Sequence, residues 1–327
     1  MQYNNNIMQF NCQEPPEQAE LLVDGATGKR SWSERKIMNE YLSLAFSEFD
    51  VNKAQRLAGC STFLQFKVFP NGEKKLATMN SCHVRLCPIC AWRRSLKVYA
   101  NVIKISDYLH NTKGRAFVMC TLTVRNCTPD ELNETINVMY QGWNRFNQLK
   151  AFKKAFKGYY RALEITRNDN PLSKDYGTFH PHFHCLFSVN KSYFTSRDYL
   201  STNTISTMWQ ESLRLAYLPL CDMRKIRGSL AKACAEVCKY SVKDSDIIVP
   251  DDWQITVETA KLLDSVMANR RLIAYGGELA EIKKFLQLED EETSKDLVHN
   301  ALEVPTEEDY KIVNYFWFSG ARGYYGF

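Results

Sequence analysis

Three of the six histidines in this 327-residue chain fall within five positions, at His180, His182 and His184. A spacing of two is the side-chain period of a β-strand, so the three imidazoles point to one face while Phe183 and Cys185 point to the other. Imidazole is a common metal ligand. The apolar neighbours favour a buried strand over a surface strand that is merely rich in histidine. The pattern therefore predicts a metal site on a buried strand.

One ion is not expected to bind all three imidazoles, because three same-face residues span about 13 Å of strand, at about 3.3 Å per residue. Two adjacent histidines and a ligand from the neighbouring strand give an easier geometry, and Pro181 interrupts the ladder just before His182 and His184. Glu164, on a predicted neighbouring strand, is the expected oxygen ligand. The alternatives are that Glu164 is an exposed carboxylate and that His180 is the third ligand. Two imidazoles and a carboxylate suit Mn²⁺ or Mg²⁺.

Cysteine supplies a second set of candidate ligands. Cys87 and Cys90 form a Cys-x-x-Cys knuckle, Cys82 stands five residues before it, and Cys60 lies across a predicted β-hairpin. This arrangement predicts a closed, tetrahedral, structural zinc site, in which His83 could replace one thiol. The alternative, a redox-active pair, lacks the βαβ context that such a pair needs.

A helix predicted near residues 229–242 contributes Glu236, Tyr240 and Lys243. Their spacings of four and three place the side chains on one helix face. A tyrosine can act as a nucleophile when a nearby cation or metal ion helps to deprotonate or steer its phenol. The alternative is an amphipathic helix in which Tyr240 only packs against the core.

The middle of the chain is strongly basic. Residues 51–250 contain 30 Lys and Arg against 14 Asp and Glu, whereas residues 1–50 contain 4 against 8 and residues 251–327 contain 8 against 15. A basic middle between acidic ends favours a polyanionic partner. The alternative is that these charges are spread over solvated helix faces, but an excess of sixteen positive charges favours it less. Arg93 and Arg94 open a predicted helix beside the cysteine knuckle, where they are expected to contact phosphates.

Nothing in the sequence resembles a membrane span or a secretory signal. No uninterrupted apolar run approaches about 20 residues, and the first residues lack a basic-then-apolar pattern. We therefore expect a cytoplasmic protein without a membrane partner. In that compartment the eleven cysteines are expected to be thiols or metal ligands rather than disulfides.

The order of predicted elements defines the expected fold. Strands are predicted at 117–124, 159–167, around the histidines and at 221–226; helices are predicted at 129–146, 197–217 and 229–242. The order β-α-β-β-α-β with a trailing helix predicts a split βαβ arrangement of the α+β class, with a central antiparallel sheet and helices on one face. In this arrangement the first strand lies beside the histidine strand, at the centre of the sheet.

Four segments are expected along the chain. They are a variable, partly disordered segment at 1–50, a small zinc-binding hairpin, knuckle and helix at 51–112, a catalytic domain at 113–285, and an acidic C-terminal extension at 286–327.

Three short motifs follow one another along the chain: Thr121-Leu122-Thr123, His182-Phe183-His184, and the stretch from Glu236 to Lys243. Together they resemble the three ordered motifs of plasmid rolling-circle replication initiators. These Rep proteins belong to the HUH endonucleases, a superfamily named for its His–hydrophobe–His metal motif. Cys87-Pro-x-Cys90 followed by Arg93-Arg94 is similar to the cysteine-rich segment of the single-tyrosine branch. The resemblance covers about residues 55 to 285.

The resemblance implies a site-specific nickase acting on single-stranded or extruded DNA at a plasmid origin. Tyr240 would attack the scissile phosphorus, giving a 5′-phosphotyrosine and a 3′-OH primer. The metal ion at Glu164, His182 and His184 would polarise the phosphate. Glu236 would activate water for the terminating cleavage.

Further roles follow from the same resemblance. Lys243 would be an auxiliary cation at the phosphate or metal site. The expected DNA-binding residues are Arg85, Arg93, Arg94 and Lys239. A host helicase and the replication machinery are the expected protein partners, because no Gly-rich nucleotide-binding loop that would indicate a fused helicase is present.

Three other classes fit parts of the pattern. Relaxases share the metal motif but tend to place the tyrosine ahead of the histidines, and transposases of this type are usually shorter and lack the cysteine-rich segment. A non-catalytic zinc-knuckle nucleic-acid-binding protein would use the basic middle and the aromatic residues as its surface.

Overall fold

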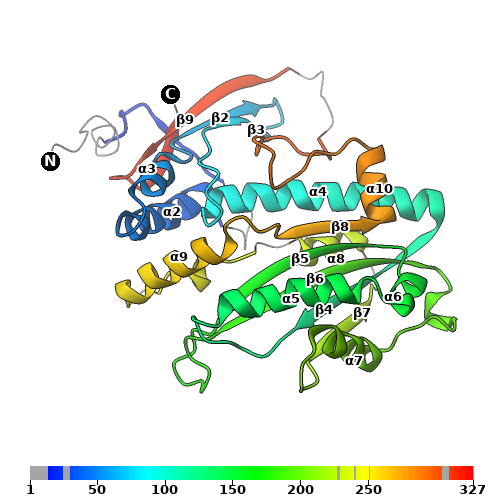
Figure 1. Ribbon diagram of the computed structural model, residues 1–327. Helices are drawn as coiled ribbons and strands as arrows, with labels where there is room; N and C mark the ends of the chain where they lie inside the picture. The colour runs from blue at the N-terminus through cyan, green and yellow to red at the C-terminus, as the bar shows by residue number, and fades with distance from the viewer. Residues whose placement is uncertain are drawn as a thin grey trace. The chain divides into compact units, whose positions relative to one another are not determined.

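The computed structural model describes residues 14–24, 30–226, 229–238, 241–249, 251–303 and 309–326. The chain forms two compact units. The first unit comprises residues 1–93, 250–261 and 295–327, and the second comprises residues 94–249 and 262–294. Each unit is built around a five-stranded antiparallel sheet with helices packed against it (Figure 1). The expected α+β class is therefore confirmed.

The sheet of the second unit has the strand order β7-β4-β6-β5-β8. Its strands are β4 (Arg115–Thr123), β5 (Gly158–Arg167), β6 (Phe179–Asn190), β7 (Cys221–Lys225) and β8 (Ile273–Gly277). The histidine strand β6 lies at the centre, between β4 and β5, as the split βαβ order predicts. A central strand has hydrogen-bonding partners along both edges, so its side chains are held firmly in register.

Helices cover both faces of this sheet, so the expectation of helices on one face is wrong. The helices are α5 (Leu132–Phe146), α6 (Lys150–Ala155), α7 (Thr202–Leu213), α8 (Leu230–Val237) and α10 (Glu278–Phe285), with short 3₁₀ turns at Tyr193–Thr195 and Asp244–Asp246. Two more, α4 (Pro88–Lys113) and α9 (Trp253–Met267), contribute residues to both units. On one face, Phe183 of β6 meets Trp143 of α5 and Trp209 of α7.

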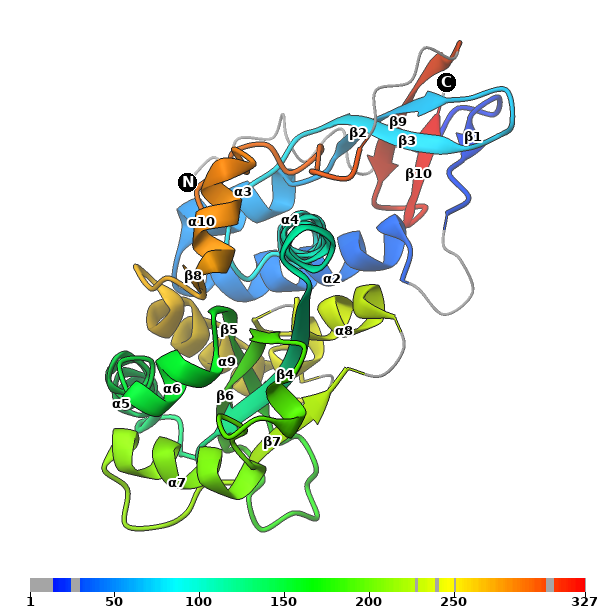
Figure 2. The same ribbon diagram turned by 90° about the vertical axis from the view of Figure 1, so that its right-hand side faces the viewer.

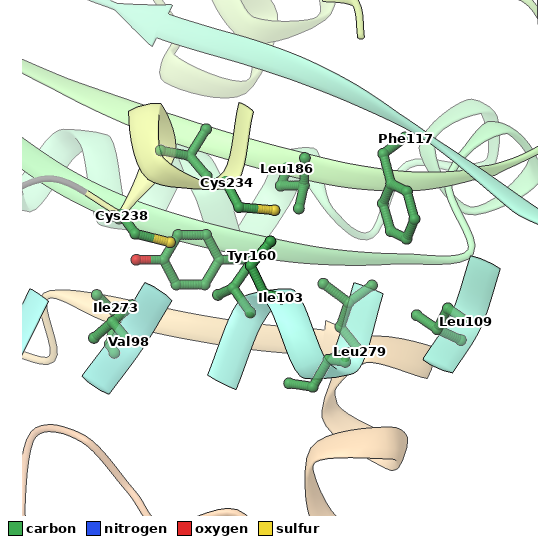
Figure 3. Close-up of a cluster of buried hydrophobic side chains, with 14 of the residues drawn as sticks. Val98, Ile103, Leu109, Phe117, Tyr160, Leu186, Cys234, Cys238, Ile273 and Leu279 are labelled. Carbon is green, nitrogen blue, oxygen red and sulfur yellow. The ribbon is translucent and has the colours of Figure 1, made fainter. Parts of the chain in front are cut away.

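The other face continues from the histidines into an apolar cluster. Tyr160 and Leu186 of the sheet pack there with Ile103 of α4, Cys234 of α8 and Leu279 of α10 (Figure 3). Apolar side chains on this part of the sheet must also be removed from water, which explains the second layer of helices. The histidine end of the same face lies beyond this cluster.

The first unit joins segments from both ends of the chain. Its sheet has the order β1-β10-β9-β2-β3 (Figure 2). The strands are β1 (Glu20–Leu21), β2 (Phe63–Val68), β3 (Lys74–Met79), β9 (Lys311–Phe318) and β10 (Gly323–Gly326), and the helices are α2 (Trp32–Ser47) and α3 (Val51–Gly59). The hairpin predicted around Pro70-Asn71-Gly72 is confirmed as β2 and β3. The acidic C-terminal stretch supplies β9, whose residues 311–316 pair with the whole of β2.

Within the part of the chain that the structure describes, no helix is both long and apolar enough to cross a membrane.

Candidate metal centres and nuclease site

The histidine strand and its neighbour bring three ligand side chains together. In the β5–β6 ladder Glu164 lies opposite His182, and Ala162 lies opposite His184. The period of two along β6 and this cross-strand pair place Glu164, His182 and His184 on the same face. The sequence predicted this pairing of Glu164 with the histidine strand.

The spacing of the three ligand atoms suits one divalent ion. His182 Nε2 lies 3.1 Å from His184 Nε2, and Glu164 Oε2 lies 2.7 Å from His184 Nε2 and 3.3 Å from His182 Nε2. Ligands at right angles around an octahedral ion, with bonds of about 2.1 Å, are about 3.0 Å apart. The two imidazoles and the carboxylate therefore have the spacing that a single octahedral divalent ion requires.

Outer hydrogen bonds orient both imidazoles. His182 Nδ1 lies 3.0 Å from the carbonyl oxygen of His180, and because a carbonyl only accepts, Nδ1 carries the proton and Nε2 keeps its lone pair. In the second ring, Nδ1 of His184 lies 3.4 Å from Oγ1 of Thr121, which is the residue paired with His184 on β4. Such outer partners fix the ring orientation of metal-binding histidines.

The Glu164 carboxylate is held in its charged form. Burial opposes its ionisation, but the hydrogen bonds and electrostatic interactions with His182 and His184 outweigh burial and hold the pKa of Glu164 well below its usual range. Its second oxygen, Oε1, lies 3.4 Å from Nζ of Lys243. A buried carboxylate that stays ionised near neutral pH is ready to bind a cation without first losing a proton.

His180 is outside this group of converging ligand atoms. The group that lies within 4.8 Å contains Glu164, His182 and His184. The ring of His180 stacks on that of His182, with centroids 5.2 Å apart, and burial lowers the pKa of His180. Its backbone carbonyl positions His182, so the geometry favours Glu164 over His180 as the third ligand.

Residues 241–243, which follow α8 in the sequence, lie outside any helix and beside the candidate metal ligands. The predicted helix runs to Val242, whereas α8 ends at Val237. Four residues later the Ser241 carbonyl accepts a hydrogen bond of 2.8 Å from the amide of Ile165, next to Glu164. The expected end of the helix at Val242 is therefore wrong, and Lys243 lies beyond α8. The expected place of Tyr240 on the same helix face falls outside the described residues and stays a prediction.

Two of the expected nuclease residues lie within the described part of the chain. Glu236 is exposed on α8, and Lys243 reaches Glu164. Tyr240 and Lys239 lie outside the described residues. Ser241, which follows Tyr240 in the sequence, is bonded to the strand that carries Glu164.

The four predicted cysteine ligands converge in the first unit. Cys60 Sγ lies 3.6 Å from the sulfurs of both Cys87 and Cys90, and Cys82 Sγ lies 3.7 Å from that of Cys90. Sulfurs bound to zinc at about 2.3 Å in a tetrahedron are about 3.8 Å apart, whereas a disulfide requires about 2.05 Å. All four cysteines are buried and unpaired, so the geometry fits zinc and not a disulfide.

His83, considered from the sequence as a substitute ligand, is outside the cysteine group. Its Nε2 lies 2.8 Å from Ser81 Oγ instead. Inside the group, burial raises the pKa of the Cys87 thiol, whereas hydrogen bonds from the other three thiols lower the pKa of Cys90. The backbone amide of Cys90 also points at Cys87 Sγ, at 3.5 Å, as expected for a knuckle that stabilises negative charge on sulfur.

Comparison with known proteins gives the family. A model of the family described as "Replication protein" matches residues 73–325. The chain belongs to this family of plasmid replication proteins. The family expected from the ordered motifs is thereby confirmed. A protein of Bacillus amyloliquefaciens named "Protein rep" is 35% identical over 91% of this chain and 95% of its own length. A "Protein rep" of Streptococcus pneumoniae is 33% identical over 86% of this chain and 87% of its own length. No solved structure matches the chain.

The sequence did not reveal how α2 of this replication protein supports the cysteines. Lys36 is fully buried, and its Nζ donates to the carbonyl oxygens of Ala58 and Cys60 at 2.7 and 2.8 Å. One turn later Asn39 is also fully buried, and its Oδ1 lies 3.1 Å from Cys87 Sγ. Polar residues three apart on a helix usually indicate an exposed face, so the pattern gave no signal of burial.

The arginines expected to contact DNA differ in their surroundings. The Arg93 side chain is engaged within the protein, where it donates to the carbonyl oxygens of Leu297 and Val298 at 2.8 and 2.5 Å. Arg85 is half-buried beside the knuckle. The Arg93 contacts tie the start of α4 to a segment about 200 residues away in the first unit.

Proposed function

We propose that this replication protein initiates rolling-circle replication of a plasmid by nicking one strand at its origin. The observation that carries the proposal is the convergence of Glu164, His182 and His184 at the strand edge to which Ser241 is bonded. A buried ligand set with an ionised carboxylate, next to Ser241, the residue that follows Tyr240 in the sequence, suits metal-assisted phosphoryl transfer.

In the proposed reaction, the phenol oxygen of Tyr240 attacks the scissile phosphorus. A bond from this oxygen to phosphorus forms, and the bond from phosphorus to the 3′ oxygen breaks. The phenol loses its proton and the departing oxygen gains one, so the products are a 5′-phosphotyrosine and a free 3′-OH. When bound, the divalent ion supplies Lewis acidity that favours charge on the phosphate oxygens.

The protein's own residues have separate tasks. His182 and His184 present Nε2 lone pairs in a fixed orientation, and Glu164 adds a negative charge. Lys243 adds a positive charge beside Glu164, where it can also attract a phosphate. Glu236, exposed on α8, would activate a water molecule for the terminating cleavage, so that no second covalent link forms.

The cysteine site has a structural role in this proposal. Zinc at Cys60, Cys82, Cys87 and Cys90 would join α3, the β2–β3 hairpin and the start of α4, and its binding free energy would contribute to folding. The proposed partners are plasmid origin DNA and a host helicase.

The decisive experiment uses a labelled single strand that carries the plasmid origin, with purified protein and Mn²⁺. We expect a covalent protein–DNA adduct that requires the divalent ion and is absent from the Tyr240→Phe variant. Tight DNA binding without cleavage, under all divalent ions tested, would instead favour a non-catalytic DNA-binding protein.

A further inference from the structure

The sheet of the first unit has one buried face and one face open to solvent. The buried face carries Phe66, Tyr315 and Trp317, and it packs on α2 through the ring contact of Trp32 with Phe66 and the hydrogen bond from Trp317 to Glu40. Side chains alternate along each strand, so the intervening residues form the opposite surface. We call this surface the outer sheet face. It comprises Leu21, Phe63, Gln65, Lys67, Lys75, Thr78, Ile312, Asn314, Phe316 and Tyr325.

The first row of the outer sheet face is apolar and mostly aromatic. Leu21 lies opposite Tyr325, Tyr325 opposite Phe316, and Phe316 opposite Phe63, so one row crosses the neighbouring strands β1, β10, β9 and β2. The rings of Phe63 and Phe316 are 5.3 Å apart. Leu21 is 50% exposed and Phe316 36% exposed, far more than a row that only fills a core would be.

The next two rows are polar. Asn314, Gln65 and Thr78 lie side by side in the second row, and the Gln65 amide donates to Asn314 at 3.0 Å. The third row consists of Ile312, Lys67 and Lys75. Lys67 also lies 4.6 Å above the ring of Tyr310, which precedes β9. Successive rows are two residues apart along the strands, or about 6.6 Å.

We propose that the outer sheet face binds single-stranded DNA. Unpaired bases expose faces that stack on aromatic side chains, amides can hydrogen-bond to their edges, and lysines neutralise the phosphates. The three rows provide these groups in this order across one surface. A duplex, whose bases are stacked inside the helix, could not use the aromatic row.

Charge favours a nucleic acid over a protein partner. The residues that make up the outer sheet face include two lysines, Lys67 and Lys75, and no Asp or Glu. The acidic residue Glu73 lies 3.7 Å from Lys75 and leaves Lys67 as the second positive charge of the row. The positive charge of the outer sheet face complements a polyanion.

This surface is separate from the residues of the proposed nuclease chemistry, so it can be tested without cleavage. The probe is a fluorescent 20-mer of thymidine, and the read-out is its anisotropy with the full chain carrying Tyr240→Phe and no added divalent ion. We expect Phe63→Ala combined with Phe316→Ala to weaken binding by roughly tenfold or more, since each stacked base contributes a factor of about 5 to 150. Phe316→Trp should retain the affinity. The matched control is Phe285→Ala, which removes a 65% exposed ring from α10 and should change nothing.

Salt dependence tests the lysine row independently. Replacing Lys67 and Lys75 by Gln should reduce the slope of log affinity against log salt by about 1.4, at about 0.7 for each phosphate that the protein no longer neutralises. The same double change at the exposed pair Lys261 and Lys295, also in the first unit, should leave the slope unchanged. A general loss of positive charge would affect both pairs equally and would overturn the assignment.

Photocrosslinking keeps the proposal testable if the alanine variant folds poorly. An oligonucleotide of 5-iododeoxyuridine irradiated with the wild-type chain should yield crosslinked peptides containing Phe63, Phe316 or Tyr325. Affinity within twofold of wild type for the double alanine variant, with crosslinks elsewhere, would overturn the proposal. If light scattering then shows a wild-type dimer that the variant cannot form, the face is a contact between copies of the chain. Binding without any nicking would count against the proposed function alone.

Discussion

Replacing Lys36 by Met tests whether α2 serves the zinc site or only the fold. Methionine keeps the length and the apolar stem but removes the ammonium group. In the native protein this group is fully buried and donates to two carbonyl oxygens at the end of α3. Burial lowers the pKa of Lys36, while Glu40 and the nearby thiols of Cys60, Cys87 and Cys82 favour the charged form.

The expected magnitude depends on zinc. Two hydrogen bonds from a charged donor contribute about 1.5–3 kcal/mol each, but removing a buried charge recovers several kcal/mol of desolvation, of the order found for buried ions. Without zinc we therefore expect a small net effect on stability. With zinc, four thiolates and one Zn²⁺ carry a net charge of −2, and the ammonium becomes their buried counter-charge. We expect Lys36→Met to weaken zinc binding by about 10- to 100-fold, the range found for groups that support metal ligands.

Competition with a coloured zinc chelator measures this affinity directly. The matched control is Lys97→Met, because Lys97 is also buried but pairs with Glu289 in the second unit. The control should lower the melting temperature and leave zinc affinity unchanged. Zinc affinity within twofold of wild type for Lys36→Met, with equal losses of stability in the zinc-loaded and zinc-free forms, would show that Lys36 only caps α3.

Three further predictions concern the proposed nuclease. Tyr240→Phe should abolish nicking and the covalent adduct, seen as a shifted band on a denaturing gel, while DNA affinity stays near that of wild type; an adduct in this variant would assign the nucleophile elsewhere. Replacing His182 and His184 by Ala should abolish Mn²⁺-dependent nicking but leave about one tightly bound zinc per chain, whereas Cys87→Ser should lower zinc content and melting temperature; zinc that is lost with the histidines would contradict two separate sites. Glu236→Gln cannot accept a proton, so first-strand nicking should survive while release of finished circles falls by roughly 10²-fold; equal loss of both steps in a product assay would exclude water activation.

The two groups of candidate metal ligands could be predicted because their signals are local or rest on a simple period. The spacing of His182 and His184 fixes one face of a strand, and a single assumption, that the strand of Glu164 is its neighbour, completes the ligand set. The cysteines needed only the turn geometry of a knuckle and a hairpin. In both cases residue chemistry and backbone period point to the same arrangement, so little tertiary information was required.

The features that escaped prediction depend on contacts distant in sequence. β9 pairs with β2 across about 250 residues, and neither its acidic surroundings nor its mixed composition indicates that partner. The end of α8 was predicted five residues too late, at Val242 rather than Val237, because residues 238–242 are compatible with a helix. The Ser241 carbonyl instead accepts a hydrogen bond from the Ile165 amide of β5, a tertiary contact that no local pattern reveals.

The hydrogen bonding along the edge of β5 also explains how the ligand residues can be held rigidly while a polynucleotide reaches them. Along this edge of β5, β8 pairs as far as Ala162. Beyond it, the Leu272 carbonyl accepts a hydrogen bond from the Leu163 amide, and the Ser241 carbonyl accepts one from the Ile165 amide. Two hydrogen bonds from β5 amides hold residues 241–246, one from Ile165 to the Ser241 carbonyl and one from Arg167 to Asp246 Oδ1 at 3.3 Å, each worth about 0.5–1.5 kcal/mol. The half-exposed ion pair of Lys243 with Glu164 adds about 0–1 kcal/mol. His182 and His184, in contrast, belong to a central strand that is bonded along both edges. In the proposed reaction the ligands can therefore keep their geometry while the neighbouring segment is displaced at low cost to admit DNA and to release it after cleavage.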